Sequence, residues 1–481
     1  MTRENNYYSW FKKIVNTCIV LFFLFSLISN LFVYVSIFEG IQKHLFFVLL
    51  LIAFGGFVYF FKDKLKALLE KVLSRLSSIN FKKLLLIIVA TSLILKVIYT
   101  IFFFFDPTEF GEDITIYASI ADSIVDNGLA SVNRDIYYLV GMGLHLSIFK
   151  RLMIPYHVGI YLVFLLGTVI NFYSFSRYIG KEKSFLAILS YLVMPSTSLL
   201  TFCITHELFV YLYFSIIFIV LNLFLEKDSN KDLILYGILI TVFVSLNQTV
   251  SPMGKIWFIL LFLIAVLTKM DMKKRIAVVL IVLLSFFCSN LLTTSLEGNK
   301  MSQNNNYEQL LIGSDLESMG RHTDGKGKRS AEAYWEARGT YLTPENFIEG
   351  QKGALLEQYK YLFTHPHRLL ELLANKFYVA WSGDFYSVEY AYNMGSIDGL
   401  VYYLMLGTGA LIWLFVVSVS LVYYKKQDSI IGVYNYKIIL LGVMAVLLIT
   451  EIMNKYSCYM TLFIYFIGFS MIGLKTDSRG V

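Results

Sequence analysis

The stretch 112–128 holds the residues whose types and spacing best suit chemistry. Asp113, Tyr117 and Ile124 recur at helical spacing, which predicts an amphipathic helix lying on the membrane. Asp113 would lie in its first turn, and Gly128 would end the helix. One interpretation is that Asp113 only caps the helix. The other is that its carboxylate is a general base at the water–lipid boundary, and the local sequence leaves both open.

A second candidate group is the pair His206-Glu207 at the start of an apolar run. A carboxylate in this position is costly unless it faces a polar cavity or a partner, and His206 precedes it directly. The alternative is an ordinary charge at the level of the lipid headgroups. The pair follows Met194-Pro195-Ser196 by about ten residues.

Cations that could stabilise a phosphate gather in the polar region 294–398 and near it. Arg368 and Lys376 lie eight residues apart in one predicted helix beside the membrane, so they are expected to share a face. Arg pairs with phosphate in a bidentate way, which favours Arg368 on chemical grounds. By default each cation is a solvated surface charge. The others are Arg321, Arg329, Lys326, Lys328, Arg338 and Lys255.

The composition requires these groups to be positioned by membrane helices. Of 481 residues, 57% are hydrophobic and 16% are charged, whereas soluble domains have about 45–50% and about 25%. This excludes a soluble nucleic-acid-binding protein, and the four cysteines show no metal-ligand spacing. Apolar runs long enough, or nearly so, to span a bilayer occur at 15–38, 45–61, 84–105, 156–176, 207–225, 233–250, 254–268, 276–293, 399–424, 437–453 and 456–474.

Charge asymmetry predicts which loops share a side. Segment 62–83 is basic and is expected to be a cytoplasmic amphipathic segment on the membrane surface. The acidic loop 106–135 and the region 294–398 are then expected outside, which requires an even number of crossings between them. Two shorter apolar runs, 137–149 and 184–199, are ambiguous, and the first is the preferred non-spanning one. The resulting parts are 1–83 (two transmembrane helices and the basic segment), 84–293 (a catalytic transmembrane module), 294–398 (an exterior α-rich subdomain) and 399–481 (C-terminal transmembrane helices).

The motif Asp113-x-Thr115-x-Tyr117-Ala118-x-Ile120, with Gly128 fifteen residues after the Asp, resembles the first exterior loop of a known family. These are the polyprenyl-phosphate-sugar-dependent glycosyltransferases of the GT-C fold, which include bacterial aminoarabinose transferases and, more distantly, protein O-mannosyltransferases. Met194-Pro195-Ser196 with His206-Glu207, and His365-Pro366 with Lys376, resemble two further elements of that family. The resemblance implies an all-α bundle of about 12 transmembrane helices.

The resemblance also implies roles for individual residues. Asp113 corresponds to the catalytic base, and Tyr117 and Gly128 support the motif. Bacterial members commonly have an acidic residue directly after the base, where this chain has Ile114. The candidates for the second carboxylate, or for the group that contacts the acceptor, are therefore Glu112, Asp106 and Glu207. Donor phosphate binding is expected from Arg368, Lys376, Arg321 and Arg329.

The activity implied is inverting transfer of a sugar from an undecaprenyl phosphate carrier to a glycan, lipid or protein acceptor of the cell envelope. No general acid is needed, because the phosphate is already a good leaving group, and no cofactor is expected, with the need for a metal left open. The protein would lie in the cytoplasmic membrane with its active site outside. Two alternatives stay open, namely a surface-polysaccharide polymerase or ligase and a transporter or flippase for lipid-linked sugars, which would have charges in mid-helix and inverted repeats.

Overall fold

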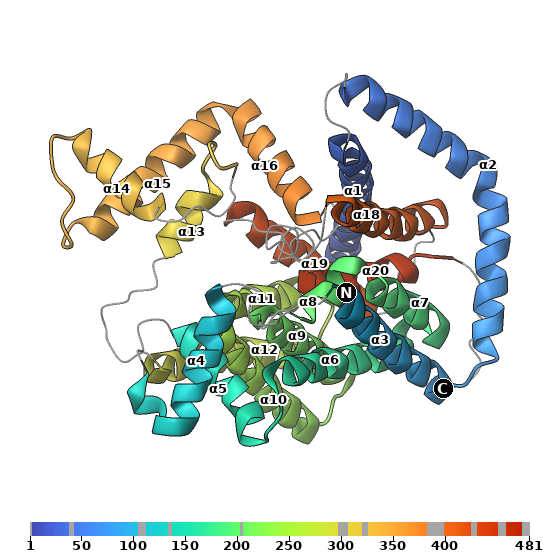
Figure 1. Cartoon of the computed structure of the whole chain (residues 1–481), viewed down its shortest axis with the longest axis horizontal. Helices are drawn as coiled ribbons and strands as arrows, with labels where there is room; N and C mark the ends of the chain where they lie inside the picture. The colour runs from blue at the N-terminus through green and yellow to red at the C-terminus, as the bar shows by residue number, and fades with distance from the viewer. Residues whose placement is uncertain are drawn as a thin grey trace.

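The computed structural model describes residues 2–37, 43–103, 112–132, 137–202, 205–296, 306–319, 326–381, 399–424, 431–450 and 458–473. Helices account for nearly all of these residues, and they contain no strand beyond one isolated bridge (Figure 1). The elements are α1 (Thr2–Ile37), α2 (Lys43–Ser77), α3 (Phe81–Phe103), α4 (Glu112–Asn127), η1 (Leu129–Ser131), α5 (Tyr137–Arg151), α6 (Tyr156–Ile179), α7 (Lys181–Leu192), α8 (Pro195–Leu200), α9 (His206–Glu226), α10 (Asn230–Val250), η2 (Pro252–Lys255), α11 (Ile256–Leu267), α12 (Met272–Leu296), α13 (Asn306–Gly313), α14 (Lys326–Glu336), α15 (Phe347–Thr364), α16 (Pro366–Trp381), α18 (Gly399–Val422), α19 (Ile431–Ile449) and α20 (Cys458–Ser470).

Eight helices among the described residues contain a segment long and apolar enough to cross a membrane, namely α1, α3, α6, α9, α10, α12, α18 and α19. Large apolar side chains such as Leu86 and Ile94 on α3 and Phe287 on α12 are more than half exposed, as expected for surfaces that face lipid. The predicted all-α, multi-pass membrane architecture is confirmed. The basic segment after residue 62 continues α2 without a break up to Ser77.

One end of the helix bundle is held together by cations, and we call it the basic end. The ammonium of Lys181 donates to the carbonyl of Ile79 at 2.8 Å, and Lys183 donates to the carbonyl of Ile472 at 2.7 Å. Lys274 pairs with Asp228 at 2.7 Å. These contacts gather the end of α2, the start of α7, the loop between α9 and α10, the start of α12 and the residues after α20.

The opposite end, which we call the α4 end, carries α4, α5 and the group α13–α16. Tyr117 of α4 contacts His206 at the start of α9, and Leu296 at the end of α12 packs on Tyr137 at the start of α5. Lys376 of α16 contacts the end of α19. The loop 106–135 and the region 294–398, so far as they are described, therefore lie at the same end, opposite the basic segment of α2.

The two ambiguous apolar runs differ in their course. Helix α5 begins beside Leu296 and ends with Lys150 paired to Asp122 of α4, so both of its ends lie at the α4 end. Its 15 residues span about 22 Å, which is short of the ~30 Å hydrocarbon layer. Run 184–199 instead connects the two ends as α7 and α8, with a break at Met194 and Pro195. The preference for 137–149 as the non-crossing segment agrees with this course.

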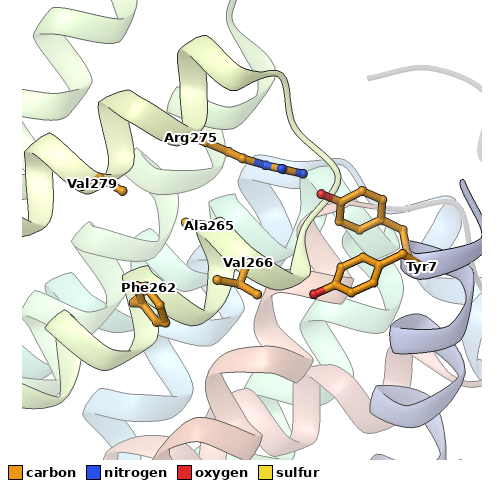
Figure 2. A pocket seen from close by; sticks show the side chains of 7 residues that line it. Tyr7, Phe262, Ala265, Val266, Arg275 and Val279 are labelled. Atoms are coloured by element: carbon orange, nitrogen blue, oxygen red, sulfur yellow. The ribbon is translucent and has the colours of Figure 1, made fainter. Parts of the chain in front are cut away.

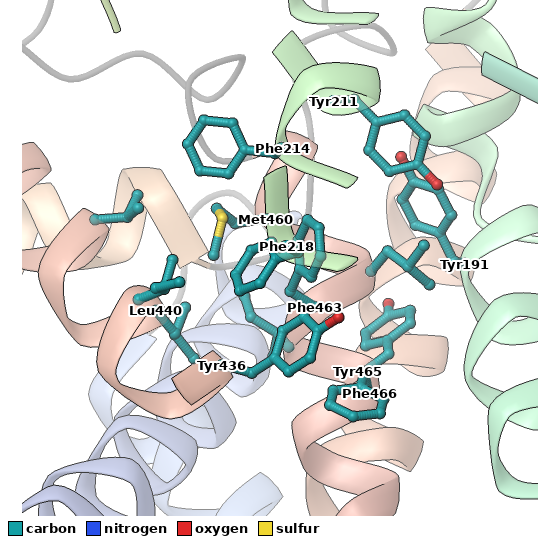
Figure 3. Close-up of a cluster of buried hydrophobic side chains, with 14 of the residues drawn as sticks. Tyr191, Tyr211, Phe214, Phe218, Tyr436, Leu440, Met460, Phe463, Tyr465 and Phe466 are labelled. Carbon is teal, nitrogen blue, oxygen red and sulfur yellow. The ribbon is translucent and has the colours of Figure 1, made fainter. Parts of the chain in front are cut away.

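Aromatic side chains fill the centre of the bundle, where α6, α9, α19 and α20 meet (Figure 3). The ring of Phe218 stacks on Tyr436 with centroids 4.2 Å apart, and Phe175 stacks on Phe466 at 4.1 Å. Since lipid tails are as apolar as these side chains, close packing of this kind holds membrane helices together.

Candidate active site

Helix α4 has the length and the stop that the motif predicts. It begins at Glu112 and ends at Asn127, and Gly128 follows with φ +81°, a conformation that favours glycine. Tyr117 and Ile124 are buried. The backbone of Asp113 lies in the first turn, whereas the side chains of Glu112 and Asp113 lie outside the described residues, as does the whole of Asp106.

Tyr117 joins α4 to the head of α9. Its hydroxyl lies 3.2 Å from Nδ1 of His206, and the two rings meet edge to face with centroids 6.4 Å apart. Nε2 of His206 lies 3.4 Å from a carboxylate oxygen of Glu207, whose side chain is 2% exposed. The amide dipoles of the first turn of α9 also favour a negative charge at Glu207. The structure therefore brings together two sequence motifs that are 89 residues apart.

Lys96, which is not among the candidate residues predicted from the sequence, contacts the segment just before the start of α9. Lys96 of α3 donates to the carbonyl of Thr201 at 2.9 Å, and its ammonium lies 3.2 Å from the centroid of the Phe202 ring. Pro195 cannot continue the hydrogen bonding of α7, so the chain restarts as the short helix α8, which leads to Thr201. Lys96 is the single charged residue of the apolar run 84–105, and that is the signal that could have identified it.

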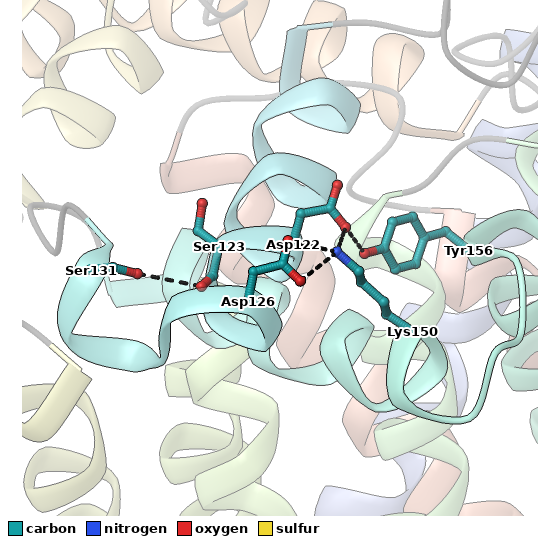
Figure 4. Close-up of polar contacts among 6 residues, drawn as sticks. All are labelled: Asp122, Ser123, Asp126, Ser131, Lys150 and Tyr156. Atoms are coloured by element: carbon teal, nitrogen blue, oxygen red, sulfur yellow. Dashed lines mark hydrogen bonds and ion pairs between the residues drawn. The ribbon is translucent and has the colours of Figure 1, made fainter.

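The second half of α4 is clamped to α5 and α6 (Figure 4). Lys150 lies 2.9 Å from Asp122 and 3.2 Å from Asp126, and the hydroxyl of Tyr156 donates to Asp122 at 2.6 Å. Partial desolvation raises the pKa of Asp122, but hydrogen bonds from Tyr156 and Lys150 and the charge of Lys150 outweigh it, so the net shift is downward. Both carboxylates therefore orient α4, and Asp122 is not suited to accept a proton near neutral pH.

His145 ties α5 to α9 within the protein. Its Nδ1 lies 2.7 Å from the carbonyl of Gly141, and its Nε2 lies 2.5 Å from the hydroxyl of Tyr213. Burial lowers the pKa of His145, so the imidazole is neutral at physiological pH. Gly141 has no room for a side chain, because a Cβ there would lie 2.0 Å from the carbonyl oxygen of Thr249. These contacts fix the position of α5, which packs against α4.

The structure corrects the role expected of Lys376. Its side chain is 0% exposed, and its ammonium donates to the carbonyls of Gly313 at 2.9 Å, Leu448 at 2.7 Å and Thr450 at 2.5 Å. An ammonium has three N–H donors, so these carbonyls satisfy it completely. In this structure Lys376 therefore joins the ends of α13 and α19.

The other expected phosphate ligands are mostly paired with carboxylates. Arg368 is exposed and pairs with Glu371, whereas Lys376 on the same helix is buried. Lys326 was expected to be a solvated loop lysine, but its side chain is 14% exposed and lies 2.8 Å from Asp315. Arg329 is exposed, and Arg321 lies outside the described residues. Lys328 pairs with Glu332, Arg338 pairs with Glu357, and Lys255 is half-buried before α11.

No protein-family profile matches the chain, and no curated protein matches it. Among solved structures, the chain is similar to ArnT from Cupriavidus metallidurans, whose crystal structure is bound to undecaprenyl phosphate. The two share 12% identity over 81% of this chain and 77% of that chain, with a TM-score of 0.35. A TM-score this low does not support a fold or a function, so the function is argued from this chain's own residues.

Proposed function

We propose that the chain is a membrane glycosyltransferase of the GT-C type, with Asp113 as general base. It would transfer a sugar from a polyprenyl phosphate carrier to an acceptor of the cell envelope, with inversion at the anomeric carbon. One observation carries the proposal. Asp113 lies one helical turn, about 6 Å along the axis, before Tyr117, which contacts His206 beside Glu207.

The chemistry divides between the base and a cation. Asp113 would accept the proton of the acceptor hydroxyl or amine as the acceptor oxygen or nitrogen attacks the anomeric carbon. The bond from that carbon to the phosphate oxygen breaks, and the phosphate leaves on its lipid without needing a general acid. Tyr117, held by His206, would fix the orientation of α4 and hence of the base.

We further propose Lys96 as a cation for the departing phosphate, in place of Lys376. Its ammonium is held at the α4 end by Thr201, five residues before His206. A lysine in the otherwise uncharged apolar run 84–105 is costly to keep, which favours a functional role. The outer surface of α3 carries exposed Leu86, Leu93 and Ile94, so a polyprenyl chain could lie along it.

Asp113→Asn tests the base, because an amide can cap a helix but cannot accept the acceptor proton. Loss of general base catalysis should lower turnover by about a hundredfold or more, with normal expression and membrane insertion. Glu112→Gln is the matched control, since it removes the adjacent carboxylate. The assay supplies a synthetic undecaprenyl phosphate sugar to the purified chain in nanodiscs. Near-normal turnover by Asp113→Asn would transfer the role to Glu112 or Asp106.

The products of the same assay distinguish the alternatives. Addition of a single sugar with inversion supports the transferase. A product several sugars long would indicate a polymerase or ligase. Passage of intact lipid-linked sugar across the bilayer without cleavage would indicate a flippase.

We propose that the α4 end faces the exterior, because the cations that join the opposite end are typical of cytoplasmic loops. The test uses a chain without its four cysteines, with Ser131→Cys at the α4 end or Ser77→Cys at the basic end. An impermeant thiol reagent added outside intact cells should label the first variant and not the second. Labelling of the second alone would reverse the orientation.

A further inference from the structure

A cavity of about 540 Å³ opens at the basic end, far along the helices from the candidate active site (Figure 2). It lies between the start of α1, the end of α11 and the start of α12. Its lining includes Tyr7 and Tyr8 from α1, Phe262 and Val266 from α11, and Arg275 and Val279 from α12. Its size is within the range of sites that bind small molecules, about 300–1,000 Å³.

The guanidinium of Arg275 is the polar group that needs a ligand here. Its Nε and Nη2 atoms are buried and have no hydrogen-bond partner among the described residues. Its Cζ lies 5.4 Å from the centroid of the Tyr8 ring, which stabilises the cation on one face only. The N–H groups of Nε and Nη2 point along one edge of the guanidinium plane, and an oxyanion can accept both together.

The described carboxylates nearby in the sequence, Asp228 and Asp271, do not satisfy this edge. Asp228 pairs with Lys274 at 2.7 Å and Asp271 accepts from the backbone N–H of Lys274, also at 2.7 Å. Lys273 donates to the carbonyl of Asp228. A buried donor without an acceptor is destabilising, and more so when it is charged. An external anion would remove that cost.

The walls of the cavity determine what kind of anion fits. Phe262 is 58% exposed and Val279 is 46% exposed. One wall of the cavity is therefore apolar and accessible. A small inorganic anion would leave this wall bare, whereas a lipid would cover it with a chain while its phosphate meets Arg275. Tyr7 and Tyr8 also line the cavity, and their hydroxyls can supply further donors.

We propose that this cavity binds the phosphate headgroup of an anionic membrane lipid in the leaflet at the basic end. Arg275 is the bidentate phosphate ligand, and one acyl chain lies along Phe262, Val266 and Val279. The site is independent of the sugar transfer proposed above, because it lies at the other end of the bundle. It would hold α1 against α11 and α12.

The test measures binding of dioctanoyl phosphatidylglycerol to the full chain purified in detergent, by native mass spectrometry. Arg275→Gln should weaken binding about tenfold or more, since it removes a charge-assisted bidentate contact. Lys273→Gln, two residues away and exposed, is the matched control and should leave binding unchanged. Equal binding by wild type and Arg275→Gln, or equal loss in both variants, would overturn the proposal.

Two further arms separate a lipid from a free anion and guard against a misfolded variant. Inorganic phosphate and a dioctanoyl glycerol, each at the same concentration, should bind far more weakly than the phospholipid. Phosphate that binds as tightly as the lipid would overturn the assignment to a lipid. Val266→Trp fills the apolar wall and keeps Arg275, so it should weaken lipid binding, and unchanged binding would overturn the placement of the chain even if Arg275→Gln does not fold.

Discussion

The helices α13–α16 and the apolar helices α3 and α12 use their cations in opposite ways. In α13–α16, Lys326, Arg338 and Arg368 each pair with a carboxylate of the same region. In α3 and α12, Lys96 and Arg275 lie on apolar helices, where the first is held by a backbone carbonyl and the second lines a cavity. Cations among acids on polar helices pair locally, whereas these two cations on apolar helices are satisfied by a distant carbonyl or need a ligand.

This difference changes where a donor phosphate is expected to bind. The density of Lys and Arg in 294–398 favoured that region, but four of its cations, Lys326, Lys328, Arg338 and Arg368, pair with carboxylates of the same region. The cations proposed to meet a lipid phosphate, Lys96 and Arg275, lie within the apolar run 84–105 and directly before the run 276–293. Three variants test the comparison.

The largest effect is expected from Lys376→Met. The variant leaves three buried carbonyl oxygens without their donor, and because burial lowers the pKa of Lys376 to about 7, each hydrogen bond contributes about 1 kcal/mol or more. We expect a loss of about 3 kcal/mol or more in the free energy of unfolding, measured as a lower melting temperature in nanodiscs. Arg368→Gln, an exposed residue of the same helix, should change it by less than about 0.5 kcal/mol. If Lys376→Met melts normally and binds donor poorly, Lys376 returns as a phosphate ligand.

A smaller effect, confined to binding of the lipid-linked donor, is expected from Lys96→Gln. Loss of one charge-assisted contact to the phosphate corresponds to about 1.5–3 kcal/mol, so the KM for the lipid-linked sugar should rise about tenfold or more. Steady-state transfer over a range of donor concentrations measures this. Arg329→Gln is the control from the polar region. A normal KM for Lys96→Gln together with a raised KM for Arg329→Gln would return the phosphate site to 294–398.

The smallest effect on stability is expected from the ion pair between Asp315 and Lys326, and it depends on pH. Desolvation raises the pKa of Asp315, but hydrogen bonds from Lys326 and Ser318 and the charge of Lys326 lower it by more, so its folded pKa is depressed. The stabilisation is therefore present above the unfolded pKa near 4 and is lost as the pH falls through the folded pKa.

At pH 7, Asp315→Asn should cost about 1 kcal/mol, and the difference from wild type should shrink below about pH 4. Thermal unfolding across pH measures this, with Glu332→Gln as the control because its partner Lys328 is exposed. A difference that persists unchanged at low pH would show that the ion pair with Lys326 is not its cause.

Helix α4 could be predicted from the sequence because its signals are local. The spacing of Tyr117 and Ile124 determines which face is buried, and Gly128 ends the helix through its own backbone preference. The non-crossing course of 137–149 could also be predicted, because length and parity limit the choices. Contacts between distant segments could not be predicted in this way.

The roles of the cations depended on such contacts. Lys376 and Arg368 are both cations of one predicted helix. Lys376 is buried against three carbonyls, whereas Arg368 is exposed beside Glu371. Which carbonyl or carboxylate meets a lysine depends on the packing of helices tens to hundreds of residues apart. No periodicity along one helix contains that information.

By itself, the sequence determined that this is a multi-pass helical membrane protein, with an amphipathic helix that carries Asp113 in its first turn. Those features follow from hydrophobic length and helical spacing, which act within one segment. Only the tertiary structure decided that Tyr117 meets His206, that Lys376 is structural and that Arg275 lines a cavity. The physical reason is that a buried polar side chain takes its role from its partner, and the partner is supplied by the packing of the helices.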